Sequence, residues 1–278
     1  MSFRNRIRTL KRSLLKRIIK RPNIFMNPSD LSALDLLLDG EWDARLQRSI
    51  SNVINQSEES IALIDIGANT GLISASFCNR VQHVVAVEPN PLASLILEAN
   101  LLIASEKQNY QIIKKALCSE DGHQNLITPQ GNLGGAYVDS VDQRLTLEQL
   151  EKKEGGQLVI HSSQTIETIS ANTFFASLYE EISRQKTNKV IFKIDTEGLE
   201  WVILEALLQS DFWREIKIAI FFECWNSSDV VAIMRLENTT LFSHRPKNPN
   251  WFICNEKTFD ANLTEFFISN YEHVPSTR

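Results

Sequence analysis

The apolar positions of the chain fall into short continuous runs separated by stretches in which they recur at helical spacing. The continuous runs, typical of buried strands, lie at 61–66, 81–87, 110–117, 190–194 and 216–222. The stretches with helical spacing lie at 72–78, 91–104, 173–185, 200–208 and 227–236. This alternation predicts an α/β fold with a doubly wound, mostly parallel sheet. Segments 239–243 and 251–255 predict a C-terminal antiparallel hairpin, and residues 29–55 predict two N-terminal helices.

The first apolar run leads directly into a glycine-containing turn. Gly67 and Gly71 lie in this turn, and the next apolar run ends at Glu88, 21 residues after Gly67. Glycine lets the backbone approach a ligand where a Cβ atom would clash. An acid at the tip of the second strand can accept hydrogen bonds from both hydroxyls of a ribose. The pattern therefore predicts a nucleotide-type cofactor site, with an ordinary strand–turn–helix as the alternative.

The identity of the cofactor depends on the details of this turn. A dinucleotide fingerprint has the pattern G-x-G-x-x-G, whereas this chain has D-x-G-x-x-x-G. Asp65 would repel a pyrophosphate, but it suits an ammonium group. S-Adenosyl-L-methionine has an amino-acid end, a sulfonium and a ribose, and it has no phosphate. We therefore expect this cofactor in preference to NAD.

A second strand–turn–helix pattern occurs at 190–208. Its strand ends at Asp195 and its turn contains Gly198, and the following strand ends at Glu223. The carboxyl ends of parallel strands meet at one edge of a sheet. Asp65, Glu88, Asp195 and Glu223 are therefore expected to converge on one cleft.

The sequences IDIGANTG, VEPNP, KKALCSEDG, NLGG and KIDTEGLE together resemble the motif series of the FkbM-type S-adenosylmethionine-dependent methyltransferases. The resemblance covers roughly residues 60–225. It implies a class I methyltransferase (Rossmann-like) fold. It also implies O-methylation, often of a sugar hydroxyl in a bacterial glycan or a related metabolite.

The same resemblance implies roles for individual residues of the cofactor site. The methionine end of the cofactor would contact Asp65, Gly67, Asn69 and Gly71. Glu88, with Pro89 beside it, would bind the ribose, and Ala116 and Leu117 would lie by the adenine. Asp195 and Glu197 would border the methyl group.

The predicted catalytic residues follow from the weak nucleophilicity of a sugar hydroxyl at neutral pH. A general base would assist such a reaction, and we assign this role first to Asp195 and second to Glu197. The alternative role of Asp195 is to hold the ammonium or sulfonium of the cofactor. Lys193 lies on the same strand face, where it can pair with Asp195 and keep it ionised. A purely structural ion pair is the alternative there.

Three further residues are assigned to the acceptor. Glu223 suits a hydroxyl-rich group, although it can also cap the following helix. Trp42 offers a flat face for a sugar ring, with core packing as its alternative use. His161 is placed within reach of the cleft. No spacing of His, Asp or Glu residues predicts a metal site.

The charge distribution adds a feature that the apolar pattern does not reveal. Residues 1–21 hold nine Lys or Arg residues and no acid, so the remaining 20 basic and 34 acidic residues give the body a charge of −14. The apolar residues of this arm recur at helical spacing: Phe3, Ile7, Leu10, Leu14, Leu15, Ile18 and Ile19. Such a basic amphipathic helix suits an anionic membrane or an acidic partner. Packing on its own domain, or on a second copy in a homo-oligomer, is the alternative.

These observations predict a basic arm (1–21), a helical cover (22–58) and a methyltransferase domain (59–278). The domain carries an irregular insertion around 123–165, where loops often determine substrate specificity. The four cysteines form no CxxC pair, and no apolar run reaches the length of a membrane span. We therefore expect a cytoplasmic protein, with contact between the arm and the inner face of the membrane as a further option. The charge of the body opposes binding to nucleic acid.

Two other functions remain open from the sequence. One is a methyltransferase that acts on a nitrogen or a lipid. The other is a non-catalytic protein that binds a membrane or a partner through a vestigial nucleotide fold. The glycine turn and its strand-tip acids favour an enzyme over this last alternative.

Overall fold

The computed structural model describes residues 24–26, 36, 42–143, 150, 160–224, 239–243, 250–255 and 272–273. The predicted basic arm and the predicted helix at 227–236 lie outside these residues, as does the first of the two predicted N-terminal helices apart from Leu36. The same holds for much of the charged part of the insertion, at 144–149 and 151–159.

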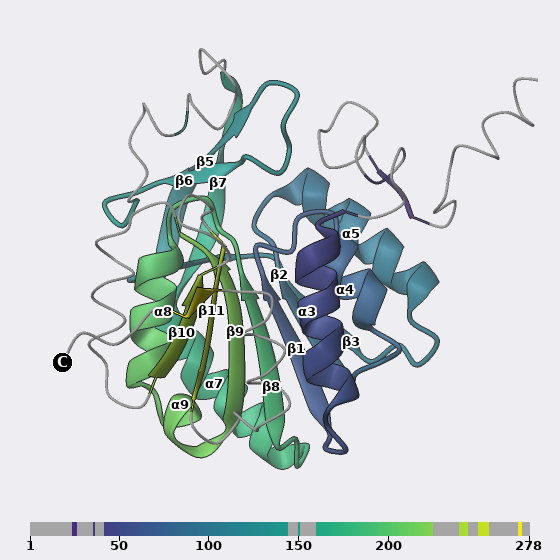
Figure 1. The fold of residues 1–278 in the computed structure, drawn as a ribbon. Helices are drawn as coiled ribbons and strands as arrows, with labels where there is room; N and C mark the ends of the chain where they lie inside the picture. The colour runs from purple at the N-terminus through teal and green to yellow at the C-terminus, as the bar shows by residue number, and fades with distance from the viewer. Residues whose placement is uncertain are drawn as a thin grey trace, which may run out of the picture.

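The large sheet has eight strands in the order β12-β10-β11-β9-β8-β1-β2-β3 (Figure 1). Its parallel strands are β1 (Ile61–Ile66), β2 (His83–Val87), β3 (Tyr110–Ile113), β8 (Lys189–Ile194) and β9 (Lys217–Glu223). β11 (Asn250–Asn255) pairs in antiparallel fashion with β9 and with β10 (Thr239–Ser243), and β10 pairs with β12 (Glu272–His273). The predicted doubly wound sheet and its C-terminal hairpin are therefore confirmed.

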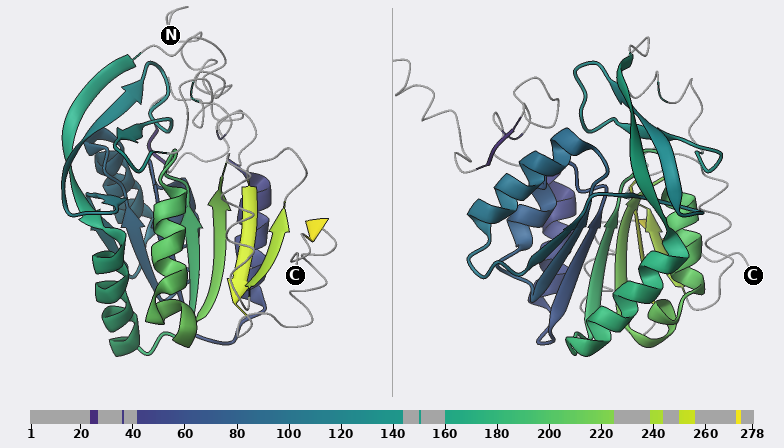
Figure 2. Two further views of the ribbon diagram at one scale, coloured as in Figure 1. Left: turned by 90° about the vertical axis from the view of Figure 1, so that its left-hand side faces the viewer. Right: turned by 180° about the vertical axis from the view of Figure 1, so that it is seen from behind.

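Helices cover both faces of this sheet (Figures 1 and 2). One face carries α3 (Ala44–Asn55), α4 (Leu72–Phe77) and α5 (Pro91–Ala104). The other carries α7 (Ala171–Arg184), α8 (Glu200–Gln209) and α9 (Asp211–Glu215). Every residue of β1 is buried, and its side chains alternate between the two cores, with Leu63 in one and Ile64 in the other. Burial on both faces explains why the parallel strands read as continuous apolar runs.

A second sheet of four strands, in the order β4-β7-β5-β6, lies beyond the carboxyl edge of the large sheet (Figure 1). It consists of β4 (Ala116–Cys118), β5 (Gly122–Pro129), β6 (Tyr137–Asp139) and β7 (Ile160–Ser170). β4 and β7 run parallel, and the other two pairings are antiparallel. Part of the insertion that was predicted to be irregular therefore forms a regular sheet.

The prediction of a single strand at 110–117 was wrong. Residues 110–113 pair with β2 of the large sheet, whereas 116–118 pair with β7 of the small one. The break falls at Lys114 and Lys115, whose ammonium groups pair at 2.9 Å with Glu98 and Glu167 near the surface. Two adjacent lysines that require solvent interrupt the burial of the strand, and the chain crosses there from one sheet to the other.

The connections between the strands of the large sheet show where a ligand is expected to bind. From β1 the chain continues through α4 to β2 on one side, and from β8 it continues through α8 to β9 on the other side. The strand order therefore reverses between β1 and β8, and ligands of doubly wound sheets bind in the crevice at the carboxyl end of such a point. None of the described helices has the length and apolar character that crossing a membrane requires.

Candidate active site

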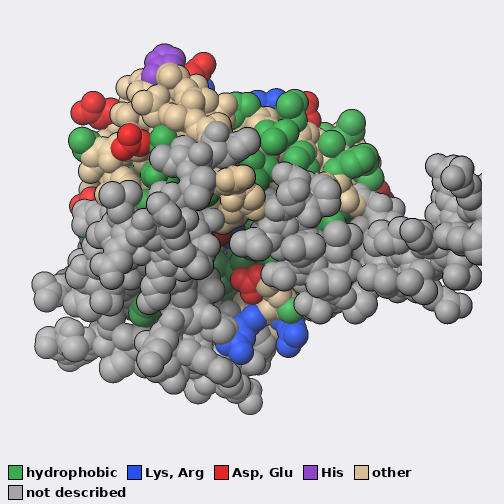
Figure 3. Space-filling view, turned by 90° about the horizontal axis from the view of Figure 1, so that it is seen from above, with side chains coloured by type: hydrophobic (Ala, Val, Ile, Leu, Met, Phe, Trp, Pro, Cys, Tyr) green, Lys and Arg blue, Asp and Glu red, His purple; other side chains and the backbone are tan. Residues whose placement is uncertain are grey.

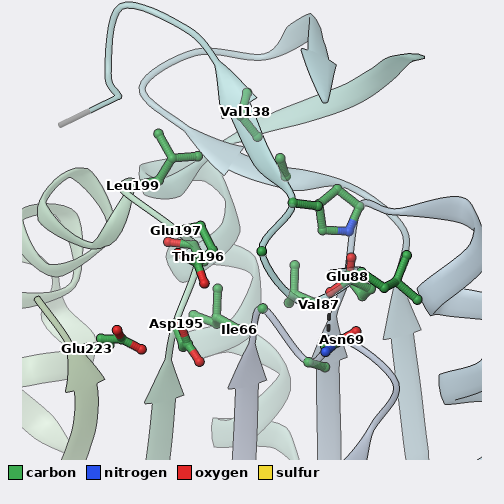
Figure 4. A pocket seen from close by; sticks show the side chains of 18 of the residues that line it. Ile66, Asn69, Val87, Glu88, Val138, Asp195, Thr196, Glu197, Leu199 and Glu223 are labelled. Carbon is green, nitrogen blue, oxygen red and sulfur yellow. Dashed lines mark hydrogen bonds between the residues drawn. The ribbon is translucent and has the colours of Figure 1, made fainter. Parts of the chain in front are cut away.

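A cavity of about 300 Å³ lies at this reversal point, between the carboxyl edge of the large sheet and the small sheet. Its volume is at the lower end of the range of small-molecule sites. Asn69 and Glu88 lie on the β1–β2 side of the cavity (Figure 4). Asp195, Glu197 and Glu223 lie on the β8–β9 side. The site therefore places carboxylates on both sides of one space.

The floor of the cavity is bare backbone at Gly67. Its φ of +74° is in the left-handed region, and an added Cβ atom would lie 1.7 Å from the carbonyl oxygen of Asp195. The tips of β1 and β8 meet at this point, where the Asp195 N–H donates to the Ile66 carbonyl at 3.0 Å. The N–H groups of Gly67 and Ala68 both donate to the Val87 carbonyl, at 2.9 and 3.0 Å. Glycine is required here because no side chain fits between the two strand tips.

Glu88 forms the wall of the cavity on its β1–β2 side (Figure 4). Its Oε2 accepts the N–H of Asn69 and its Oε1 accepts the N–H of Asn90, both at 2.7 Å. Burial raises the pKa of Glu88 to about 7, against the opposing effect of these two N–H donors. Each carboxylate oxygen keeps a lone pair for a further donor, such as a ribose hydroxyl.

Asn69 provides a second acceptor on this side of the cavity. Its backbone is left-handed, with a φ of +49°. The Asn69 Oδ1 atom is buried and has no hydrogen-bond partner within the described residues. A ligand with an N–H or O–H group would satisfy this oxygen.

A buried lysine joins the strand tips beneath the floor. Lys193 is the parallel register partner of Asp65, and its Nζ lies 3.5 Å from Asp65 Oδ1 and 3.6 Å from Asp195 Oδ2. It also donates to the Gly67 carbonyl at 2.6 Å. Burial acts to lower the pKa of Lys193, but Asp195, Asp65 and Glu88 outweigh it, and the pKa is raised. Lys193 is therefore charged and holds the two aspartates together.

Asp65 does not lie in the cavity, contrary to the expected convergence of four acids. Its side chain is fully buried, and its Oδ2 accepts the hydroxyl of Ser74 on α4 at 2.6 Å. Because side chains alternate across a strand, an acid one residue before the strand tip points into the helix layer. Asp65 reaches the site through Lys193 alone among the described contacts.

The turn after β8 is held in a strained conformation. Glu197 has a φ of +58°, and its carbonyl accepts Nε2 of Gln143 at 2.9 Å. The carboxylate of Glu200 accepts the N–H of Thr196 at 2.7 Å and the N–H of Gly198 at 3.0 Å. Glu200 is buried and caps this turn, which supports a structural role for it.

The remaining predicted site residues have three different outcomes. Five of them line the cavity: Trp42, Pro89, Ala116, Leu117 and Glu223. Gly71 does not, and its glycine requirement has another cause, because a Cβ atom would lie 2.5 Å from Leu97 Cδ1 on α5. His161 belongs to β7, and its side chain lies outside the described part of the chain.

The sequence did not predict the apolar wall that the small sheet supplies. Leu126, Leu133 and Val138 face the cavity together with Leu117. The motif NLGG indicated that this segment belongs to the site, because Asn132 to Gly135 all line the cavity. The described residues contain no group of three or more His, Cys, Asp or Glu side chains that could hold a metal ion.

Comparisons with known proteins add a family match. The model of the Methyltransferase FkbM domain family matches residues 65–246, which is more than half of the chain. No curated protein gives a significant match to the sequence.

Several solved structures resemble the fold. Precorrin 8w decarboxylase from Methanobacterium thermoautotrophicum has a TM-score of 0.40 and 14% identity, over 84% of this chain and 96% of that one. An rRNA methylase from Streptococcus thermophilus has a TM-score of 0.40 and 11% identity, over 74% and 92%. M. capricolum TrmK in complex with S-adenosyl-homocysteine has a TM-score of 0.37 and 14% identity, over 76% and 70%.

Proposed function

The chain belongs to the FkbM methyltransferase family, and from this premise we propose that it methylates a sugar hydroxyl in a bacterial glycan or a related metabolite. Its cofactor is S-adenosyl-L-methionine. The observation that carries the proposed acceptor is the group of carboxylates on the β8–β9 side of the cavity, at Asp195, Glu197 and Glu223.

The residues on the β1–β2 side fit the cofactor. Glu88 would accept the ribose hydroxyls, and Gly67 lines the cavity beside it. The unpartnered Oδ1 of Asn69 would accept a donor from the ligand. The apolar wall from Leu117 to Val138 suits the flat faces of a base. When bound, the cofactor supplies an electrophilic methyl group on a sulfonium.

The residues on the β8–β9 side would bind the acceptor and accept its proton. A carboxylate at Asp195 can accept the proton of the reacting hydroxyl, and Glu197 is the second candidate for this role. Lys193, 3.6 Å from Asp195 Oδ2, fixes the position of that carboxylate. Glu223 and Trp42, which also line the cavity, would bind other hydroxyls and the ring face of the sugar.

The charge of the lining opposes an anionic acceptor. The lining contains four acids, Glu88, Asp195, Glu197 and Glu223, and two lysines. Both lysines already pair with carboxylates, Lys115 with Glu167 and Lys193 with Asp65 and Asp195. An excess of negative charge opposes phosphate-bearing acceptors and nucleic acid, whereas a neutral polyol or an amine is compatible with it.

The affinity for S-adenosylmethionine is expected to fall below neutral pH. The pKa of Glu88 is about 7 in the free protein, so the carboxylate that accepts ribose hydroxyls is protonated progressively as the pH falls from 8 to 6. If only the ionised form binds well, the dissociation constant rises by about tenfold over this interval. Calorimetric titration with S-adenosylmethionine at several pH values measures this dissociation constant. A Glu88→Gln variant should bind weakly and without this pH dependence, and a constant affinity in the wild type would contradict the assignment.

The proposed reaction is tested with methyl-labelled S-adenosylmethionine and a panel of glycans, amines and lipids. We expect label in a glycan fraction, and a loss of about 100-fold or more in rate for Asp195→Asn, because a general base contributes that much. Glu205→Gln is the matched control, since Glu205 is exposed on α8. Label found in amines or lipids alone would overturn the sugar acceptor. A weaker affinity of Asp195→Asn for the cofactor at an unchanged rate would assign Asp195 to cofactor binding instead.

A further inference from the structure

The outer face of α5 is apolar and exposed along its length. Leu92 and Ile103 are 52% exposed, and Leu95 and Leu102 are 60% exposed. Partly buried Ile96 and Ala99 lie between them on the same face, whereas Leu97 and Leu101 pack into the core. Single exposed apolar residues are ordinary, but a continuous stripe of them on one helix indicates a surface that binds something.

The chain segment that follows the basic arm is attached to this helix. The N–H of Phe25 donates to Asn100 Oδ1 at 2.6 Å, and Asn100 Nδ2 donates back to the Phe25 carbonyl at 3.0 Å. Asn100 is buried, whereas Phe25 is 56% exposed. Phe25 therefore adds a fifth exposed apolar side chain beside the stripe on α5.

This attachment limits the distance between α5 and the C-terminal end of the basic arm. Arg21 lies four positions before Phe25 in the sequence, and four steps of extended chain span at most about 14 Å. The basic segment, which ends at Arg21, is therefore joined to α5 through a short stretch of chain.

We infer that the outer face of α5, together with Phe25, docks on an anionic lipid bilayer, and that the nine cations of residues 1–21 supply the charge that attracts this bilayer. The interface of a bilayer accepts apolar side chains and attracts each nearby Lys or Arg with about 1 kcal/mol. The rest of the chain carries a charge of −14 and would be repelled by such a bilayer without the arm. Glu98, at the edge of the stripe, is paired with Lys114 at 2.9 Å, so it adds no unpaired charge there.

The position of this surface relates it to the cavity. α5 begins at Pro91, two residues after the cavity-lining Pro89. Viewed from above the carboxyl edge, apolar side chains gather on the side that α5 forms (Figure 3). Docking would thus bring a membrane-bound acceptor close to the site. This consequence rests on the proposed function, whereas binding to the bilayer does not.

Co-sedimentation of the full-length chain with vesicles tests the inference without any acceptor. We expect binding to vesicles of phosphatidylcholine with phosphatidylserine, little binding to phosphatidylcholine alone, and weaker binding at high salt. The double variant Leu95→Gln/Leu102→Gln should bind at least about tenfold more weakly, because two exposed leucines no longer enter the interface. Val141→Gln is the matched control, since Val141 is 98% exposed and lies outside this surface.

A variant of the arm tests the contribution of its charge. Replacing Lys16, Arg17, Lys20 and Arg21 together with glutamine should weaken binding by at least about tenfold. Equal binding by the wild type and the α5 variant would overturn the inference, as would equal binding to both kinds of vesicle. Self-association that the α5 variant abolishes, without vesicle binding, would overturn it in favour of a second copy of the chain.

Discussion

Replacing Lys193 by methionine is expected to lower the free energy of unfolding by about 3–5 kcal/mol, the cost of leaving a buried charge without its partner. The ammonium of Lys193 is buried between Asp65 and Asp195, and Asp65 is completely inaccessible to solvent. Methionine has a similar length, so the cavity term is small and the effect is mainly electrostatic. Urea denaturation measures the loss.

Two comparisons separate this charge effect from a general effect of mutation. Lys217→Met removes the half-exposed pair with Glu59 and should cost about 1 kcal/mol. Adding Asp65→Asn to Lys193→Met removes the unpaired carboxylate and should restore part of the lost stability. Equal losses for Lys193→Met and Lys217→Met would show that the buried network does not hold the strand tips together.

The second large effect is expected for Gly67→Ala. An alanine there has to adopt a φ of +74°, which costs about 1–2 kcal/mol, and its Cβ would lie 1.7 Å from the Asp195 carbonyl oxygen. Relieving this clash would move β8 away from β1, and such overpacking lowers the free energy of unfolding by a further amount of about 1–3 kcal/mol. The same movement displaces Asp195, so cofactor binding should be lost as well.

Gly131→Ala provides the matched control for this prediction. Gly131 has nearly the same φ, +76°, but nothing lies within 4 Å of the position of an added Cβ atom. It should therefore show the backbone strain alone, at about 1–2 kcal/mol. Thermal unfolding and calorimetric titration of both variants measure the difference. Equal losses in the two would contradict the close contact of the strand tips.

The elements with sharp local signals were predictable from the sequence. The run at 61–66 matches β1, and the helix at 91–104 matches α5, where Asn90 caps the first turn and Pro91 occupies its first position. The acids at the ends of buried strands also predicted the cavity, because Glu88, Asp195 and Glu223 all line it.

The features that depend on pairing between distant segments were not predictable. The small sheet forms because β5 pairs with β6 and β7, and none of these pairings leaves a periodic signal as strong as a buried parallel strand. Gly71 looked like a ligand-binding glycine, but its role depends on contact with Leu97 on another helix. The direction of Asp65 depends on the pleat of β1 and on its partner Lys193 in β8.

The central claim is that the cavity binds S-adenosylmethionine through Glu88, and calorimetric titration with S-adenosylmethionine and with NADH tests it most directly. We expect micromolar binding of S-adenosylmethionine to the wild type and to a Glu106→Ala control, in which an exposed glutamate is removed. We expect no binding to Glu88→Ala, and no heat with NADH. Failure of the folded wild type to bind S-adenosylmethionine, or undiminished binding by Glu88→Ala, would contradict the account.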